Sequence, residues 1–506
     1  MNMVLPGLRA LDQRPHAVVI GAGFGGLAAA IRLGARGWRV TVLDRLDQPG
    51  GRARVHRQDG FTFDAGPTIV TAPHVFEELW ALCGRRMADE VPLVPLPMFY
   101  RLRFDDGSTF AAYADRDSMR AEVARLSPGD LAGFDRLMAL SGRLCRTGFE
   151  ELGHRPFDSL ASMLRVLPDM LRLGAWRSVH GLVARHLRDE RLRTAFSFHP
   201  LLIGGNPFAA SGIYAMIPHL EQKWGVHWAL GGTNALVQGL VGLIEGQGGR
   251  LRLRAEAARI LTRDGRACGV ELRGGERIAA DIVVSNACAS FTYGTLLRDV
   301  PRRRWSDARL SRARHSMGLF VWYFGTRRRF EGVDHHTILL GPRYRGLLRD
   351  IFDRGRLPPD PSLYLHRPTA TEPGMAPAGC DAFYVLAPVP HLGHGTDWER
   401  EAEPFRRLIA ARLNATVLPG FEAEVVTSRI ATPVDFRDDF LSVHGAGFGL
   451  EPRLLQSAWF RPHNASEDLP GLYLVGAGTH PGAGLPGVVS SARVLDEVVP
   501  HARAFA

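Results

Sequence analysis

The sequence contains a single lysine and few cysteines. Lys223 is the only lysine among 506 residues, so arginine supplies nearly all of the positive charge behind the net charge of +10. The five cysteines are scattered and form no C-x-x-C pair, a pattern typical of reduced thiols that predicts neither a disulfide framework nor a metal site. The arginine bias is typical of a GC-rich genome. The excess positive charge still favours anionic surfaces, and membrane lipid is one candidate.

Long apolar runs and nucleic-acid recognition modules are also missing. No stretch of about 18 apolar residues occurs, so no transmembrane helix is predicted. The N-terminal residues MNMVLPGLRALDQRP lack the apolar core of a secretory signal. No aromatic-studded basic stripe or zinc-ligand spacing points to nucleic acid. We therefore expect a cytoplasmic protein of two or more domains. Any contact with the membrane is expected to be peripheral, on its cytoplasmic face.

Glycine, by contrast, is abundant and concentrated near both ends of the chain. Near the N-terminus, Ala17–Ile20 predicts a buried strand, Leu27–Arg36 a helix, and Val40–Leu43 a second strand. The turn between the first strand and the helix reads G-x-G-x-x-G. This βαβ unit is typical of a dinucleotide-binding fold.

Each residue of the motif has a separate expected task. Gly21 makes the turn, Gly23 lets the backbone approach a pyrophosphate, and Gly26 lets helix and strand pack closely. Asp44 ends the second strand, where a carboxylate accepts hydrogen bonds from the adenosine ribose. The pyrophosphate is expected at the positive end of the helix.

A second glycine pair extends the motif. Gly50, Gly51 and Arg52 follow the βαβ unit and provide backbone N–H donors and a cation for the far half of a cofactor. An NAD enzyme does not need this extension, whereas flavoproteins of the amine oxidase and carotenoid desaturase group carry it. The sequence therefore favours FAD.

The other glycine-rich segment lies near the C-terminus. Leu472–Val475 predicts a buried strand, and a glycine-rich loop then leads into a helix expected from Val489. Gly478, Gly487 and Val488 of this loop are expected to bring backbone to the flavin ring and its ribityl–phosphate chain.

The middle of the chain is helical and apolar. Phe157–Arg188 carries leucine, methionine and tryptophan at three- and four-residue spacing, punctuated by arginines. This face either lies in a membrane interface or packs on the core of a helical subdomain. Leu201–Ile217 has almost no charge and suits the wall of an apolar pocket or tunnel.

Several segments together carry a family resemblance. GAGFGGLAAAIRL, DQPGGRA, FDAGPT, AFSFHPLLIGGNPF, GLFVWYFGT, SLYLHRP, LAPVPHL, LQSAWFRPHN and YLVGAGTHPGAGLPGVVSSA occur in order along the chain. Taken together, from about residue 15 to 495, they resemble the bacterial CrtI-type phytoene desaturases of the flavin amine oxidase superfamily.

The resemblance implies an α/β fold with a Rossmann-like FAD-binding domain, a mixed-sheet substrate domain and a helical, membrane-associating subdomain. It implies further cofactor contacts at Gly66, Pro67 and Thr68, and at Ala257, a position often occupied by valine. The domain boundaries expected are 15–95, 225–290 and 466–500 for FAD binding, 96–224 for the helical region, and 291–465 for the substrate domain.

The implied reaction is the stepwise desaturation of phytoene, an apolar C40 hydrocarbon, to neurosporene or lycopene. FAD suits it because the flavin accepts a hydride and passes electrons to oxygen or a quinone. The alternatives are a later-pathway carotenoid desaturase, a carotenoid isomerase, a flavin- or lipid-binding protein without turnover, and a soluble amine oxidase.

No catalytic residue is predicted. His199, His227 and His366 lie in the segments that carry the resemblance, but none has a spacing that fixes a role, and each reads as a buried core histidine. The proton can also leave a stabilised allylic cation without a dedicated base.

Overall fold

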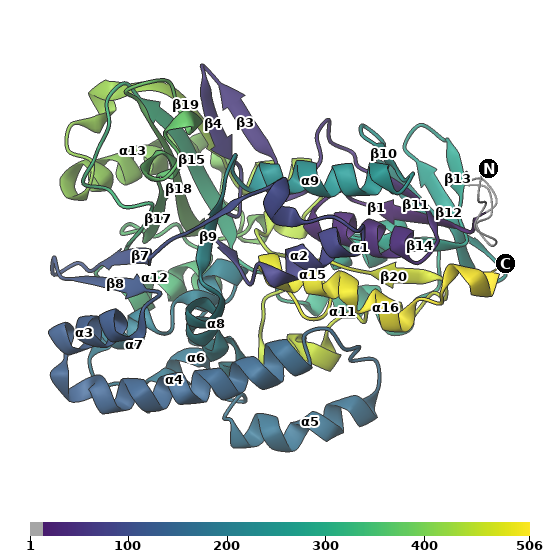
Figure 1. Cartoon of the computed structure of the whole chain (residues 1–506), viewed down its shortest axis with the longest axis horizontal. Coiled ribbons are helices and arrows are strands. Elements are labelled where there is room, and N and C mark those ends of the chain that lie inside the picture. The colour runs from purple at the N-terminus through teal and green to yellow at the C-terminus, as the bar shows by residue number, and fades with distance from the viewer. Residues whose placement is uncertain (1–13, 506) are drawn as a thin grey trace, which may run out of the picture.

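The computed structural model describes residues 14–505, as drawn in Figure 1. Residues 1–13 of the N-terminal stretch MNMVLPGLRALDQRP, in which no secretory signal is predicted, lie outside this range. Within the described range no helix is both long and apolar enough to cross a bilayer.

The predicted βαβ unit forms part of a parallel five-stranded sheet with the order β10-β2-β1-β14-β20. β1 pairs in parallel with β2 on one side and with β14 on the other. The sheet therefore joins strands from three distant stretches of sequence. Its strands are β1 (His16–Ile20), β2 (Arg39–Leu43), β10 (Arg250–Arg252), β14 (Ile282–Ser285) and β20 (Leu472–Leu474).

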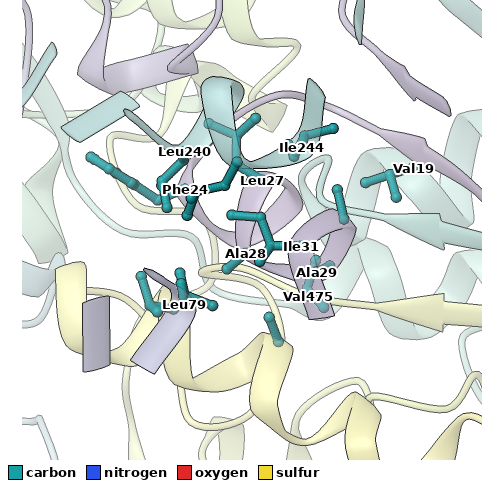
Figure 2. Close-up of a cluster of buried hydrophobic side chains, with 14 of the residues drawn as sticks. Val19, Phe24, Leu27, Ala28, Ala29, Ile31, Leu79, Leu240, Ile244 and Val475 are labelled. Atoms are coloured by element: carbon teal, nitrogen blue, oxygen red, sulfur yellow. The ribbon is translucent and has the colours of Figure 1, made fainter. Parts of the chain in front are cut away.

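Helices cover one face of this sheet. Figure 2 shows Leu27 and Ile31 of α1 beside Leu240 and Ile244 of α9, all in one buried cluster with Val475. Alanines along α1 allow close packing, because they bury little volume between helix and sheet. The helices here are α1 (Phe24–Ala35), α2 (His74–Ala81), α9 (Thr233–Gly246), α15 (Leu485–Arg493) and α16 (Leu495–Val498).

The opposite face packs on a small antiparallel sheet of β11 (Ala257–Arg263), β12 (Arg266–Leu272) and β13 (Arg277–Ala279). The sequence pattern predicts Ile278–Val284 as one strand, but the structure divides it between β13 and β14. Asp281 lies at the break and accepts a hydrogen bond from the backbone N–H of His16 at 2.7 Å. The chain changes sheets at this point.

A mixed seven-stranded sheet with the order β19-β15-β18-β17-β16-β7-β8 forms the second large unit. Every pair is antiparallel except β16 with β7. β15 is buried along its whole length, with one core cluster on each face. The strands are β7 (Met98–Arg103), β8 (Thr109–Tyr113), β15 (Gly318–Thr326), β16 (His336–Leu339), β17 (Leu363–His366), β18 (Asp381–Val389) and β19 (Val425–Ala431).

Short elements connect the two units. The hairpin of β3 (Val55–Gln58) and β4 (Phe61–Asp64) and the small sheet of β5 (Val70–Thr71), β9 (Val226–Ala229) and β6 (Leu93–Pro95) lie between them. The remaining helices of this part are α10 (Ala289–Phe291), α11 (Asp307–Arg312), α12 (Tyr344–Arg349), α13 (Trp398–Thr416) and α14 (Pro433–Phe440). The sequence pattern predicts a helix over Phe405–Leu418 that packs on the seven-stranded sheet, and α13 does so but begins earlier, at Trp398.

A helical region lies below both sheets in Figure 1 and comprises α3 (Arg116–Leu126), α4 (Leu131–Cys145), α5 (Leu160–Arg172), α6 (Val179–Val183), α7 (Glu190–Ala195) and α8 (Ile217–Trp224). α5 lies at its outer edge and contains no buried residue. Pro168 sits inside α5 and does not divide it into two helices.

Candidate functional site

One cavity of about 780 Å³ runs from the glycine turn after β1 to the inner side of α5. Apolar atoms supply most of its wall. Twelve of the fourteen predicted cofactor residues line it: Gly21, Gly23, Asp44, Gly50, Gly51, Arg52, Gly66, Pro67, Thr68, Ala257, Gly487 and Val488. Gly26 and Gly478 do not.

The turn after β1 brings backbone unusually close to backbone. A Cβ atom on Gly26 would lie 2.0 Å from the carbonyl oxygen of Gly21, so only glycine permits this contact between turn and helix. Gly23 forms the N-cap of α1, and no described side chain caps the first turn of that helix. The N–H groups of that turn therefore face the cavity and favour an anion.

Asp44 is held in place by the same turn. Its two carboxylate oxygens accept hydrogen bonds from the backbone N–H groups of Ala22 and Leu46, at 2.7 and 2.9 Å. Burial raises the pKa of Asp44, and these two N–H donors oppose that rise. The carboxylate still borders the cavity, where it can accept from ribose hydroxyls.

The second glycine pair also borders the turn. Gly50 has a left-handed φ of 106°, and its N–H donates to the carbonyl of Ala22 at 2.8 Å. Arg52 reaches the cavity, and its buried Nε has no partner among the described residues. Burial lowers the pKa of Arg52. An unsatisfied cationic donor beside an anion-favouring turn is suited to a phosphate or an electron-rich ring.

A second helix N-terminus faces the cavity from the C-terminal segment. The helix begins at Leu485, four residues before the predicted start at Val489, so Gly487 and Val488 lie in its first turn and not in a loop. Gly484 caps it with a φ of 101°, and no described side chain does so. Gly478 instead packs against α10, where a Cβ would lie 2.8 Å from the Cβ of Ala289.

Arg461, which no sequence pattern indicates, holds this glycine-rich segment. Its guanidinium is buried and donates to the carbonyl oxygens of Gln456, Ala477 and Thr479 at 3.0 to 3.3 Å. A Cβ on Gly482 would meet its Nη1 at 2.3 Å. Arg461 lies in the RPHN segment, but a lone arginine there carries no signal of such a role.

The far part of the cavity is apolar. Leu201, Ile203, Ile213 and Ile217 line it, as expected for the segment 201–217, together with the α5 side chains Met163, Val166 and Met170. Four acidic residues line the cavity along its length. Asp44, Glu256 and Asp439 lie near the glycine turns and have backbone or arginine partners.

Glu221 is the fourth acid, and it comes from α8 within the apolar part. It is buried, and Tyr100 Oη donates to its Oε2 at 3.0 Å. Because the tyrosine has a single proton to give, His199 Nε2 must donate to Tyr100 Oη, at 2.9 Å. Burial and the Glu221 carboxylate raise the pKa of Tyr100 well above its usual value. The three residues lie far apart in sequence, so no spacing pattern reveals them.

The three histidines considered from sequence lie in different surroundings. His199 is buried beside Tyr100, His227 is half-buried on β9, and His366 is buried at the end of β17. None of the three histidines lines the cavity.

The fold and the glycine turns define a class, that of flavoprotein oxidoreductases. The profile model described as "Flavin containing amine oxidoreductase" matches residues 24–494. A crystal structure of an oxidoreductase from Methanosarcina mazei shares the fold, with a TM-score of 0.64, 19% identity, and coverage of 95% of this chain and 100% of that one.

Closer relatives narrow the class. A phytoene desaturase (neurosporene-forming) of Cereibacter sphaeroides is 50% identical over 503 residues, which is 98% of this chain and 97% of the relative. A phytoene desaturase (lycopene-forming) of Pantoea ananas is 47% identical over 476 residues, 94% of this chain and 97% of the relative. The chain belongs to the phytoene desaturase family of flavin-containing oxidoreductases. The family resemblance predicted from the sequence is thus confirmed.

The cavity fits the cofactor of this family, FAD. Two uncapped helix N-termini favour the diphosphate, Asp44 provides a ribose acceptor, and glycines at positions 21, 50 and 484 adopt left-handed φ values. The chain is an FAD-dependent oxidoreductase, as the sequence predicts.

Replacing Gly23 with valine tests the first turn. A Cβ there already lies 3.0 Å from Nδ2 of Asn286, and the added methyl groups would occupy the space beside the N-terminus of α1. We expect Gly23→Val to lower bound flavin at least about tenfold, measured as the ratio of flavin to protein absorbance.

Gly242→Val is the matched control, because a Cβ at this position of α9 meets nothing within 4 Å. It should keep full flavin occupancy. Stoichiometric flavin in Gly23→Val would contradict the assignment of this turn.

Proposed function

We propose that the chain catalyses the stepwise desaturation of phytoene to neurosporene or lycopene, with FAD as the oxidant. The continuous cavity supports this most directly, because it joins an anion-favouring, glycine-lined end to an apolar end. A dinucleotide suits the first end and a C40 hydrocarbon the second. Full-length identity of about one half to phytoene desaturases supports the same substrate class.

The proposal assigns cofactor contacts to the predicted site residues. Gly21, Gly23 and the first turn of α15 would hold the diphosphate side, and Asp44 the ribose. Gly26 and Gly478 would act by close packing, which allows the loops to approach. The FAD-binding parts are then 15–95, 225–290 and 466–500, with a helical region at 96–224 and a substrate domain at 291–465.

Desaturation removes a hydride and a proton from adjacent carbons. When bound, FAD supplies the two-electron acceptor for the hydride. The apolar wall binds and extends the chain, and it excludes water from the reacting carbons. Oxygen or a quinone would reoxidise the flavin.

We assign the proton to Glu221, the one acid on α8 in the apolar part of the cavity wall. The hydrogen bond from Tyr100 keeps its Oε2 oriented, and His199 Nε2 lies 3.5 Å from the same oxygen.

The exposed apolar surface of α5 supports peripheral membrane binding, on the cytoplasmic side. Leu160, Leu164 and Leu171 are each more than half exposed, and Leu455 is 70% exposed. The cavity reaches this surface, because Leu171 and Leu455 also line it. Apolar substrate could therefore pass from lipid to cavity beside one helix. Arg165 and Arg172, also exposed, suit contact with anionic headgroups.

The activity is tested with purified FAD-loaded protein and phytoene in anionic vesicles. Without an electron acceptor, phytoene should bleach the flavin absorbance. Adding oxygen or a quinone should then yield coloured products, which chromatography identifies as neurosporene or lycopene.

Other outcomes separate the alternatives. A product formed without an acceptor and without net oxidation would indicate an isomerase. Flavin that no carotenoid bleaches would indicate a binding protein, and bleaching only by oxygenated carotenoids would place the chain at a later step of the pathway.

The proton acceptor is tested by Glu221→Gln. We expect flavin reduction by phytoene to slow by about 100-fold or more at unchanged flavin content, since a positioned base contributes about that much. Glu245→Gln, an exposed position on α9, should match the wild type. A wild-type reduction rate in Glu221→Gln would show that the proton leaves by another route.

Membrane binding is tested by placing aspartate at Leu164 and Leu171 together. Each leucine buried in the interface contributes about 1.5 to 3 kcal/mol, so vesicle partitioning should fall at least tenfold. Leu82→Asp with Leu408→Asp changes two exposed leucines away from α5 and should leave partitioning nearly unchanged. Equal partitioning of both double variants would refute the role of α5.

A further inference from the structure

Three buried histidines meet beside the cavity. His336 of β16 and His366 of β17 are directly opposed in the antiparallel register, and His335 comes immediately before β16. One ring nitrogen of each residue lies within 4.8 Å of the others. Within residues 14–505 this is the one group of histidine, cysteine or acidic side chains gathered so closely.

Several ring nitrogens of this cluster lack partners. Nε2 of His335, of His336 and of His366 are all buried without a hydrogen bond among the described residues. All three side chains are at most 7% exposed. Nδ1 of His366 also makes no hydrogen bond among the described residues. An unsatisfied buried polar group destabilises the folded protein, so a cluster of them favours a ligand that satisfies it.

The outward-facing nitrogens are anchored as in metal sites. His335 Nδ1 bonds to Thr371 Oγ1 at 2.6 Å, and His336 Nδ1 bonds to Tyr364 Oη at 2.7 Å. A hydrogen bond from the second ring nitrogen is typical of metal-binding histidines, because it fixes the ring and its tautomer.

We propose that His335, His336 and His366 bind one divalent transition-metal ion, and that Zn²⁺ suits the donor set best. Three imidazoles and an open fourth position are a known zinc arrangement, whereas Ca²⁺ and Mg²⁺ prefer oxygen ligands.

The nearby charged groups are already paired. Arg367 donates to Asp381 at 2.9 Å, and Glu372 accepts from Trp228 Nε1 at 2.7 Å. The Trp228 ring lies 5.1 Å from His335 and 5.3 Å from His366 between centroids, so an aromatic wall closes one side. The metal would thus be held in a dry site, by nitrogen alone from the protein.

The site is connected to the cavity. Tyr364 Oη bonds to both His336 Nδ1 and Thr68 Oγ1, the latter at 2.5 Å, and Tyr364 and Thr68 line the cavity. A metal on Nε2 of His336 places the proton on Nδ1, which donates to Tyr364. The tyrosine hydroxyl must then donate to Thr68. The ion would therefore set the direction of this hydrogen-bond chain and would link β16 to β17. Neither effect depends on which substrate the protein binds.

The test uses untagged, FAD-loaded full-length protein from zinc-supplemented cells, passed over a desalting column with EDTA. Elemental analysis should find about one zinc per chain. Removing it with dipicolinate should lower the unfolding temperature, and Zn²⁺ should restore it. Co²⁺ in its place should give the visible bands of a four-coordinate ion.

His366→Gln should lose the metal and the Co²⁺ bands. The surface histidines His391, His394 and His444 also lie close together, so His394→Gln with His444→Gln is the control and should keep the metal. A folded, flavin-loaded wild type that contains no metal and takes up neither Zn²⁺ nor Co²⁺ would overturn the proposal. Loss of metal in the control but not in His366→Gln would do the same.

Discussion

The contact between Gly26 and the Gly21 carbonyl is the constraint on which the site depends. Since a single Cβ would come within 2.0 Å of that oxygen, α1 can lie against the turn only with glycine there. This seating aims the uncapped first turn of α1 at the cavity. Asn286, at the end of β14, fills the space behind it and donates from Nδ2 to the same Gly21 carbonyl at 3.3 Å. Strand, turn and helix therefore form one rigid anion-binding corner.

Segments from remote parts of the chain meet at this glycine turn. β14 supplies Asn286, and a Cβ on Gly25 or Gly476 would collide with the Asn286 side chain. The glycine segment after β20 thus approaches the turn after β1 through one asparagine. Arg461 then holds that segment by its carbonyls, and α15 adds its own N-terminus. Two glycine-rich segments more than 400 residues apart in sequence therefore form one site. They can approach each other because glycine leaves no side chain between their backbones.

Local patterns predicted the part of the site that is local in sequence. The G-x-G-x-x-G turn, Asp44 and Gly50–Arg52 could be found because their spacing is fixed by one βαβ unit. The division of 278–284 between two sheets and the early start of α15 depend on tertiary partners such as His16, so periodicity missed them. Glu221 with Tyr100, and the three-histidine cluster, depend on pairing between strands and helices that no single window contains.

The two ends of the cavity differ in polarity, and this difference determines which end binds the cofactor and which end binds the substrate. Near the glycine turns each acid has a charged or N–H partner, so charge is tolerated there: Glu256 pairs with Arg45 and Asp439 with Arg54. In the apolar part Glu221 accepts from the hydroxyl of Tyr100, and His199 Nε2 lies 3.5 Å from the same oxygen. An anionic dinucleotide is stabilised by the partners at the first end, whereas at the second it would lose its hydration without compensation. A hydrocarbon is better accommodated at the second end, where it displaces no water from polar groups. The exposed leucines of α5 continue the apolar wall to the surface, and this continuity explains why a helix at the edge of the molecule keeps an apolar face uncovered.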